Sequence, residues 1–312
     1  MKVLLTGGTG FIGSYVLMQL VKEGHDVTVL ARNAQKVPAF TTMKQVEVLE
    51  VPMTDFEGTK QALKGKDACI HVALNYNDDS GYDMLMNDTA PSVFLASEAA
   101  KAGVKHFIYT SSTAALDNIY SLPDPFVNSA AHDVISAQTK QDPQSYYGAT
   151  KAAVENFLLA IGSQTDMRVN IIRPGYTFGN PVMAGAFTQP DSRFKDIVQA
   201  AVSGEKLEII KNDGTQFLWG GDIAKIYTAV LNGNMQKKIY FGLSNQFTSW
   251  EFIAREAIKQ SKSSSELIIK DLGWSEKPIL FDVSDIEKDF GFSFSPHPHI
   301  EEHVAYYVNL LT

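Results

Sequence analysis

The sequence contains a single cysteine, Cys69, among its 312 residues. One cysteine excludes an internal disulfide framework and favours a reducing compartment. Cys69 stands in an apolar run that is typical of a buried strand, so we expect it to be a small core residue. Hydrophobic runs are short as well, because none approaches the ~18 residues that cross a bilayer, and residues 3–5 are too few for an export signal. We therefore expect a cytoplasmic protein with no membrane partner.

Basic residues are outnumbered by acidic ones, and they form no long cluster. The 27 lysines and arginines and the 35 aspartates and glutamates give a formal net charge of −8. This balance disfavours nucleic acid and anionic membranes as partners. The seven histidines contain no H-E-x-x-H motif, and no metal site is predicted.

The first 175 residues alternate short β-branched runs with helical patterns. Strands are predicted at 3–5, 27–30, 46–49, 68–72, 106–109 and 169–172, and helices at 11–23, 55–64, 83–102 and 143–161. This rhythm of βαβ units predicts an α/β fold, a Rossmann-type doubly wound parallel sheet with helices on both faces. Residues 1–175 would form this domain, with 211–235 returning to it, and 176–210 and 236–312 would form a smaller C-terminal substrate-binding region.

One long segment, residues 114–142, breaks this rhythm. It carries Pro123 and Pro125 and has no clear periodicity. Loops of this length inside compact domains are usually functional or mobile. Two interpretations stand, a lid on the substrate side or an ordinary surface insertion.

The segment TGGTGFIG at residues 6–13 joins the first predicted strand to the first predicted helix. Gly7 permits a tight turn, Gly10 lets a ligand approach the backbone, and Gly13 lets helix and strand pack closely. The N-terminus of a helix presents unpaired N–H groups and the positive end of its dipole, which together bind a pyrophosphate. The turn therefore predicts a dinucleotide site in the 1–175 domain, with a glycine-rich turn that binds nothing as the alternative.

The second predicted strand ends in VTVLARN, which bears on the choice of cofactor. An NAD-binding chain has an acid here for the ribose hydroxyls, whereas this chain has Ala31 followed by Arg32. An arginine can pair bidentately with a 2′-phosphate, and the missing acid removes a repulsion. We expect NADP(H), with NAD as the alternative if Arg32 is only a solvated surface residue.

These motifs resemble those of the extended short-chain dehydrogenases/reductases, the NAD-dependent epimerase/dehydratase family. Besides residues 6–13, the similar segments are ACIHVAL (68–74), YTSSTA (109–114), YYGATK (146–151), IIRPGYTFGNP (171–181), FLWGGDIAKI (217–226) and DFGFSFSP (289–296). They follow the family's order and spacing over nearly the whole chain. The resemblance implies a cofactor site made of Gly7, Thr9, Gly10, Phe11, Ile12, Gly13, Arg32, Met53, Ala73, Tyr147, Lys151, Pro174 and Thr177.

The adenine end of that site departs from the family's pattern. The segment VPMTD at 51–55 has Pro52 where the family commonly has the aspartate that reaches the adenine. We therefore expect backbone groups or an apolar contact from Met53 to recognise the base.

Tyr147 and Lys151 are the predicted acid/base pair. They are four residues apart, so on a helix both side chains can face one pocket. In the family, the tyrosine at this place holds or releases the proton, and a neighbouring ammonium and a cationic nicotinamide favour the phenolate of a group whose ordinary pKa is ~10. Tyr146 is the competitor, but its partner four residues on is the uncharged Thr150.

A hydroxyl at the end of the fifth strand should complete the catalytic set. Strand alternation and the resemblance both favour Ser112, which would donate to a substrate carbonyl oxygen, and Thr113 is the alternative. The family's dehydratases carry an Asp-Glu pair just after this hydroxyl, where this chain has Thr113 and Ala114. Dehydration is therefore disfavoured.

The predicted activity is hydride transfer between NADP(H) and a small carbonyl or alcohol substrate through Ser112, Tyr147 and Lys151. One alternative is an NAD-dependent sugar-nucleotide epimerase. Another is a regulatory or redox-sensing protein that binds NADP without turnover, which the presence of the Tyr-Lys pair disfavours. A monomer and a homodimer both agree with the sequence.

Overall fold

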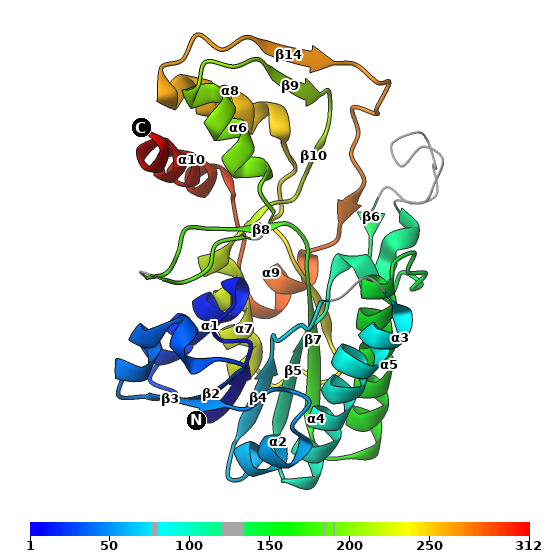
Figure 1. Ribbon diagram of the computed structural model, residues 1–312. Coiled ribbons are helices and arrows are strands. Elements are labelled where there is room, and N and C mark those ends of the chain that lie inside the picture. The colour runs from blue at the N-terminus through cyan, green and yellow to red at the C-terminus, as the bar shows by residue number, and fades with distance from the viewer. Residues whose placement is uncertain (77–79, 120–133, 184, 190) are drawn as a thin grey trace.

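A parallel sheet of seven strands forms the centre of the protein in the computed structural model, which describes residues 1–76, 80–119, 134–183, 185–189 and 191–312 (Figure 1). The strand order is β12-β7-β5-β4-β1-β2-β3. The strands are β1 (Lys2–Thr6), β2 (Asp26–Ala31), β3 (Val46–Glu50), β4 (Ala68–His71), β5 (His106–Thr110), β7 (Arg168–Pro174) and β12 (Ile239–Gly242). The chain runs outward from β1 to β3 and then from β4 to β12, so the predicted Rossmann-type doubly wound fold is confirmed.

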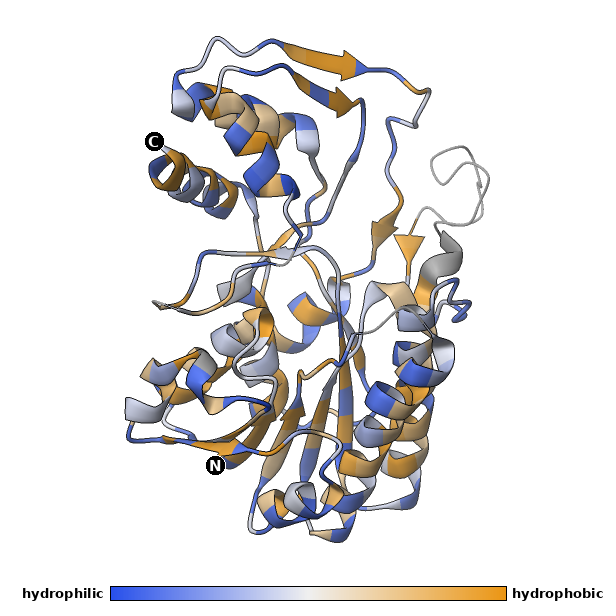
Figure 2. Cartoon of the chain, viewed as in Figure 1, coloured by the Kyte–Doolittle hydropathy of each residue, from blue (hydrophilic) through white to orange (hydrophobic). Residues whose placement is uncertain are grey.

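Both faces of this sheet carry buried apolar side chains, and the hydrophobic colour predominates along its strands with hydrophilic bands between (Figure 2). Side chains alternate between faces along a strand. In β1, Val3 and Leu5 therefore join one core cluster while Leu4 joins the other. Cys69 of β4 is a fully buried member of the second cluster, as its apolar surroundings in the sequence predict.

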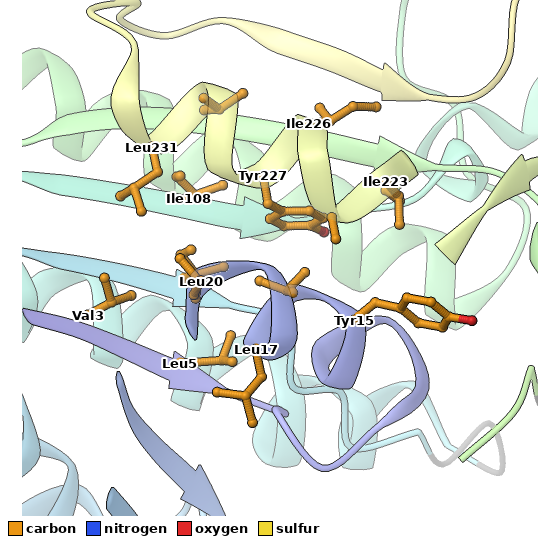
Figure 3. Packing of buried hydrophobic residues seen from close by; sticks show 14 of the residues in the cluster. Val3, Leu5, Tyr15, Leu17, Leu20, Ile108, Ile223, Ile226, Tyr227 and Leu231 are labelled. Atoms are coloured by element: carbon orange, nitrogen blue, oxygen red, sulfur yellow. The ribbon is translucent and has the colours of Figure 1, made fainter. Parts of the chain in front are cut away.

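Helices cover the two faces. The first face is covered by α1 (Phe11–Lys22) and α7 (Gly220–Asn232), and the second by α2 (Phe56–Leu63), α4 (Ala90–Lys101) and α5 (Tyr146–Gln164). Figure 3 shows the side chains of α1 and α7 gathered against each other and against the strands. A hydrogen bond of 2.6 Å between the hydroxyl oxygens of Tyr227 and Thr110 joins α7 to β5. Helix α7 thus lies beside α1 on the first face of the sheet.

The helix predicted at 83–102 is divided into three parts. A short α3 (Gly81–Met84) leads into a π-helical turn, η3 (Leu85–Thr89), which continues into α4. A π turn holds one residue more than an α turn and often occurs at functional sites. Asp88 lies in this turn and is buried.

Most of the remaining elements form a smaller part of the molecule at the top of Figure 1, whereas α9 (Ser284–Phe290) packs against β12 and the first core cluster of the large sheet. The helices of the smaller part, α6 (Arg193–Val202), α8 (Trp250–Ser261) and α10 (His297–Leu311), share an aromatic-rich core. The short strands are β6 (Val134–Ile135), β8 (Thr177–Phe178), β9 (Leu207–Ile210), β10 (Gly214–Thr215), β11 (Leu218–Trp219), β13 (Thr248–Ser249), β14 (Leu267–Lys270) and β15 (Leu280–Phe281), and α9 (Ser284–Phe290) precedes α10. Among the described residues, no helix is long and apolar enough to cross a membrane.

The chain returns to the large sheet more often than the predicted division of domains implies. Strand β12 lies next to β7 in the sheet, although the division assigned 236–312 to the smaller region. The division itself stays a prediction. The segment 114–142, predicted to be a lid or a surface insertion, lies outside the described residues at 120–133, and its described part includes β6, which pairs with β15.

Candidate active site

A cavity of about 530 Å³ lies along the carboxyl edge of the sheet. This is the edge at which open α/β sheets bind ligands. Every residue predicted for the cofactor site or the catalytic set lines this cavity. These residues are Gly7, Thr9, Gly10, Phe11, Ile12, Gly13, Arg32, Met53, Ala73, Ser112, Tyr147, Lys151, Pro174 and Thr177. The structure thus brings the whole predicted set together, while the role of each residue stays a prediction.

The glycine turn fits a pyrophosphate. Gly7 has a φ of +72°, and a Cβ there would lie 2.6 Å from the backbone nitrogen of Ala73. A Cβ on Gly13 would lie 2.0 Å from the carbonyl oxygen of Gly7, so helix and strand touch without room for a side chain. Gly10 begins α1 with no side-chain cap and no acid in the first turn. The N-terminal N–H groups of α1 therefore meet the cavity with their positive dipole end uncovered.

Arg32 lines the cavity directly after the end of β2. Its Nη1 donates to the side-chain oxygen of Asn75 over 3.2 Å. Because β1 lies between β2 and β4 in the sheet, this bond reaches across the end of β1 and the glycine turn. Ala31 is buried where an acid would otherwise stand, and Met53 packs on the apolar cluster beneath it. This end of the cavity thus combines one exposed guanidinium with an apolar floor.

Helix α5 presents Tyr147 and Lys151 to the cavity on successive turns. It begins at Tyr146 because the Ser145 hydroxyl accepts from the backbone N–H of Gly148 over 3.0 Å, a helix N-cap. The Nζ of Lys151 lies 5.7 Å from the centroid of the Tyr147 ring. Tyr146 is 54% exposed and does not line the cavity, so the structure places Tyr147 and not its competitor there.

Lys151 is buried in the cavity wall. Its Nζ donates to the carbonyl oxygen of Thr110 over 3.1 Å and lies 5.0 Å from the centroid of the Tyr109 ring. Burial lowers the pKa of this amine, and the carboxylates of Asp88 and Glu155 act in the opposite direction. A buried ammonium is costly unless other groups balance its charge.

Ser112 lies two residues beyond the end of β5 at Thr110. It is half-buried, lines the cavity, and its hydroxyl accepts from the backbone N–H of Ala114 over 3.1 Å. That contact leaves the hydroxyl hydrogen able to point at a ligand oxygen. Thr113 is buried and is not part of the cavity wall, so the geometry favours Ser112 over Thr113.

His71 lines the cavity as a neutral side chain. Its Nδ1 lies 2.6 Å from the hydroxyl of Thr6 and its Nε2 lies 2.8 Å from the hydroxyl of Ser92. Burial, together with the charge of Lys151, lowers the pKa of His71 to about 3. A ring that is neutral at ordinary pH and bonded at both nitrogens joins β1, β4 and α4 rather than exchanging protons.

Residues that the sequence analysis did not single out also line the cavity. Asn75 follows β4, and Asp88 lies in the π turn. The segment between β8 and α6 contributes Phe187, Thr188 and Gln189. An acid within an otherwise apolar helical pattern was the available signal for Asp88. No pattern in the sequence marks the last three, because they lie in a segment without periodicity.

Two histidines on α10 have a spacing that zinc ligands can share, since His299 and His303 are four residues apart. Each has other contacts, however. The Nδ1 of His303 lies 2.6 Å from Asn180 Oδ1, and the His299 ring stacks on Trp219 with centroids 4.9 Å apart. In the described part of the chain, no group of three or more His, Cys, Asp or Glu side chains could hold a metal ion.

A comparison with known families agrees with this geometry. The model of the NAD dependent epimerase/dehydratase family matches residues 3–240. The chain belongs to this family. The resemblance in its motifs is thereby confirmed, and the match extends from β1 into β12.

Individual members of the epimerase/dehydratase family are distant. The sterol-4-alpha-carboxylate 3-dehydrogenase (decarboxylating) of Dictyostelium discoideum is 28% identical over 57% of this chain and 54% of its own length. The 3 beta-hydroxysteroid dehydrogenase/Delta 5-->4-isomerase of Mycobacterium tuberculosis is 27% identical over 77% of this chain and 64% of its own. This chain therefore spans less than two thirds of either relative.

Solved structures show the same fold along the whole chain. The UDP-glucuronic acid 4-epimerase from Bacillus cereus, in complex with NAD, aligns with a TM-score of 0.79 at 18% identity and covers 100% of both chains. The smaller part of the molecule is therefore included in the likeness, which at this identity concerns the fold alone.

Proposed function

We propose that this chain is an NADP(H)-dependent oxidoreductase that interconverts a small carbonyl compound and its alcohol. The observation that carries the proposal is a single cavity whose wall includes both the uncapped glycine turn and the set of Ser112, Tyr147 and Lys151. A dinucleotide that lies along the turn has its reactive end within reach of a phenol, an ammonium and a hydroxyl only if these groups share one cavity.

The residues present fit such a cofactor. The N-terminus of α1 would hold the pyrophosphate, Arg32 the 2′-phosphate, Met53 the adenine, and Lys151 the ribose hydroxyls. When bound, the nicotinamide supplies a donor or acceptor of hydride. The exposed guanidinium and the apolar Ala31 at the end of β2 support NADP(H) over NAD.

The side chains of this protein would handle the proton and orient the substrate. Tyr147 holds a proton at its hydroxyl oxygen and delivers it to the substrate oxygen in the direction of reduction. The ammonium of Lys151, 5.7 Å from the ring of Tyr147, stabilises the phenolate that remains. The Ser112 hydroxyl donates to the same substrate oxygen and polarises the carbonyl.

The experiment is an assay of NADPH oxidation at 340 nm against a panel of aldehydes and ketones. Tyr147→Phe should lower kcat about 10²- to 10⁴-fold, since general acid/base catalysis contributes that much. Tyr146→Phe is the matched control, because the neighbouring tyrosine is exposed outside the cavity and should leave kcat unchanged. Equal activity of wild type and Tyr147→Phe would contradict the proposed mechanism.

A sugar-nucleotide epimerase is the second candidate, which the fold shared with a UDP-glucuronic acid 4-epimerase favours. The same purified chain distinguishes the two. Conversion of a UDP-sugar into its 4-epimer with NAD, without net NADPH oxidation, would favour the epimerase. Binding of NADPH without turnover of any carbonyl or UDP-sugar would favour a regulatory role instead.

A further inference from the structure

Asp88 is a buried carboxylate in the wall of the cavity. It is 4% exposed and lies in the π-helical turn η3, which packs against helix α5. Its Oδ1 accepts from the backbone N–H of Asn75 over 2.8 Å. Its Oδ2 is buried and has no hydrogen-bond partner among the described residues. A buried carboxylate oxygen in this state is costly, so a favourable interaction elsewhere must keep it there.

The ammonium of Lys151 is the cation that acts on Asp88, because both residues line the same cavity and η3 packs against α5. Burial is the larger influence on each group, since it lowers the pKa of Lys151 and raises that of Asp88, and the charge of each partner acts in the opposite direction. Both side chains are almost completely shielded from solvent, because Lys151 is 2% exposed and Asp88 is 4% exposed. At low dielectric such a pair interacts even when the two groups are not in direct contact.

Other titratable groups around Lys151 do not provide the same balance. Glu155, one turn further along α5, is bound at both of its oxygens by the buried guanidinium of Arg173, over 2.9 and 2.7 Å. His71 is neutral. Burial raises the pKa of the Tyr109 and Tyr227 phenols, which are therefore neutral as well, and the ring of Tyr147 lies 5.7 Å from the Lys151 Nζ. Asp88 is thus the carboxylate near Lys151 that the described hydrogen bonds do not commit to another cation.

We propose that Asp88 is a positioning residue whose negative charge balances buried Lys151 and so keeps the ammonium available to Tyr147 and to a bound ribose. The π turn supports this role, because it brings Asp88 inward toward α5 while the Asn75 N–H fixes its other oxygen. Asp88 acts through Lys151 and touches no substrate, since its free oxygen is buried. The effect of Asp88 on catalysis rests on the proposed function. Its effect on the charge of the Lys151 amine does not.

The test measures the titration of Lys151 directly in the chain without cofactor. Nuclear magnetic resonance of a sample labelled with ¹³C at the lysine ε-carbons follows each amine with pH, and Lys151→Met identifies the resonance. Asp88→Asn keeps the shape and the acceptor for the Asn75 N–H but removes the charge. We expect the pKa of Lys151 to fall by about one unit or more in this variant. Asp83→Asn, a partly exposed acid in α3, is the matched control and should leave it unchanged.

A second readout is the pH profile of kcat/KM. The limb that falls at high pH should move to lower pH in Asp88→Asn by the same amount as the titration of Lys151, and Asp83→Asn should retain the wild-type profile. An unchanged Lys151 titration in folded Asp88→Asn overturns the inference, even if the chain reduces carbonyls. An absence of turnover in the wild type overturns the proposed function. The titration of the Lys151 amine in Asp88→Asn still tests the role of Asp88 in that case.

The wild-type chain alone also tests the inference if Asp88→Asn does not fold. A Lys151 amine that is neutral at pH 7 in the wild type would contradict it. A Lys151 amine that is charged at pH 7, together with an Asp88 carboxyl that is ionised there, is the expected result.

Discussion

Arg32 is the residue on which the choice between the two nicotinamide cofactors depends. It is exposed, it lines the cavity, and its guanidinium already holds an oxygen acceptor, the side chain of Asn75, over 3.2 Å. A phosphate would be a stronger acceptor than this amide, because both partners would then be charged. The side chain of Ala31 supplies no hydrogen bond to a ribose, so the proposed preference for a 2′-phosphate rests on Arg32 alone.

Replacement of Arg32 by alanine should therefore weaken NADPH far more than NADH. We expect the Kd of NADPH to rise about 10- to 100-fold, as for the loss of a charge-assisted hydrogen bond, and the Kd of NADH to change little. Fluorescence titration of each reduced cofactor measures both constants. Lys44→Ala, which removes an equal charge from an exposed site, controls for the net charge. A similar loss of affinity for both cofactors would show that Arg32 does not read the phosphate.

The residues found from the sequence are those that local rules determine. The glycines stand at fixed places in one turn, and Tyr147 and Lys151 are one helical turn apart, so short-range geometry brings each set together. Asp88 was missed because its role depends on burial beside a side chain from another helix, and no local pattern contains that information. His71, too, is explained only by the two hydroxyls that the fold brings to its ring nitrogens.

At the scale of elements, the junction of β1 and α1 combines two different demands on glycine. A Cβ at Gly13 would overlap the Gly7 carbonyl, whereas a Cβ at Gly10 would meet only that oxygen, at 3.3 Å. Gly10 also has an extended backbone, with φ of −83° and ψ of −179°, that any residue adopts. Packing therefore requires glycine at position 13, whereas glycine at position 10 is required only for the proposed approach of a ligand to the N-terminus of α1.

Two alanine substitutions should separate these demands. Gly13→Ala should lower the free energy of unfolding by about 1–3 kcal/mol, as overpacking does. Gly10→Ala should change it by less than about 1 kcal/mol, yet raise the Kd of NADPH about tenfold or more, because the methyl group keeps the phosphates from the backbone N–H groups. Urea unfolding and fluorescence titration give the two quantities. If Gly10→Ala bound NADPH like the wild type, the pyrophosphate would not lie on this turn.

The order of the elements in the large sheet could be predicted because its inner strands are buried on both faces and its helices on one, which gives distinct periodicities. Their ends were less certain. The helix expected at 143–161 begins at Tyr146 because the Ser145 hydroxyl caps it, and it extends to Gln164. The π turn at Leu85–Thr89 was not visible, since one inserted residue barely disturbs an apolar pattern. Strand β12 pairs with β7, which is about 70 residues away along the chain, and no local signal specifies such a pairing.

At the scale of the whole molecule, the cavity has walls from parts of the chain that lie far apart in the sequence. The sheet contributes its carboxyl edge, and the segment between β8 and α6 contributes Phe187, Thr188 and Gln189. Tyr15 of α1 fixes the start of that segment, because its hydroxyl donates to the carbonyl oxygen of Asn180 over 2.5 Å. A ligand in the cavity therefore contacts elements that come apart only when the chain unfolds.

Such a ligand should stabilise the entire chain, and NADP⁺ should do so more than NAD⁺. At a concentration of about 100 times its Kd, a ligand that binds only the folded state adds about 2.7 kcal/mol to the free energy of unfolding. For a chain of this size that corresponds to a rise in Tm of roughly 5 °C. Thermal unfolding with equal concentrations of the two oxidised cofactors, in wild type and Arg32→Ala, measures the effect. Wild type should show the larger rise with NADP⁺ and Arg32→Ala should show equal rises, whereas equal rises in the wild type would mean that the fold does not distinguish the 2′-phosphate.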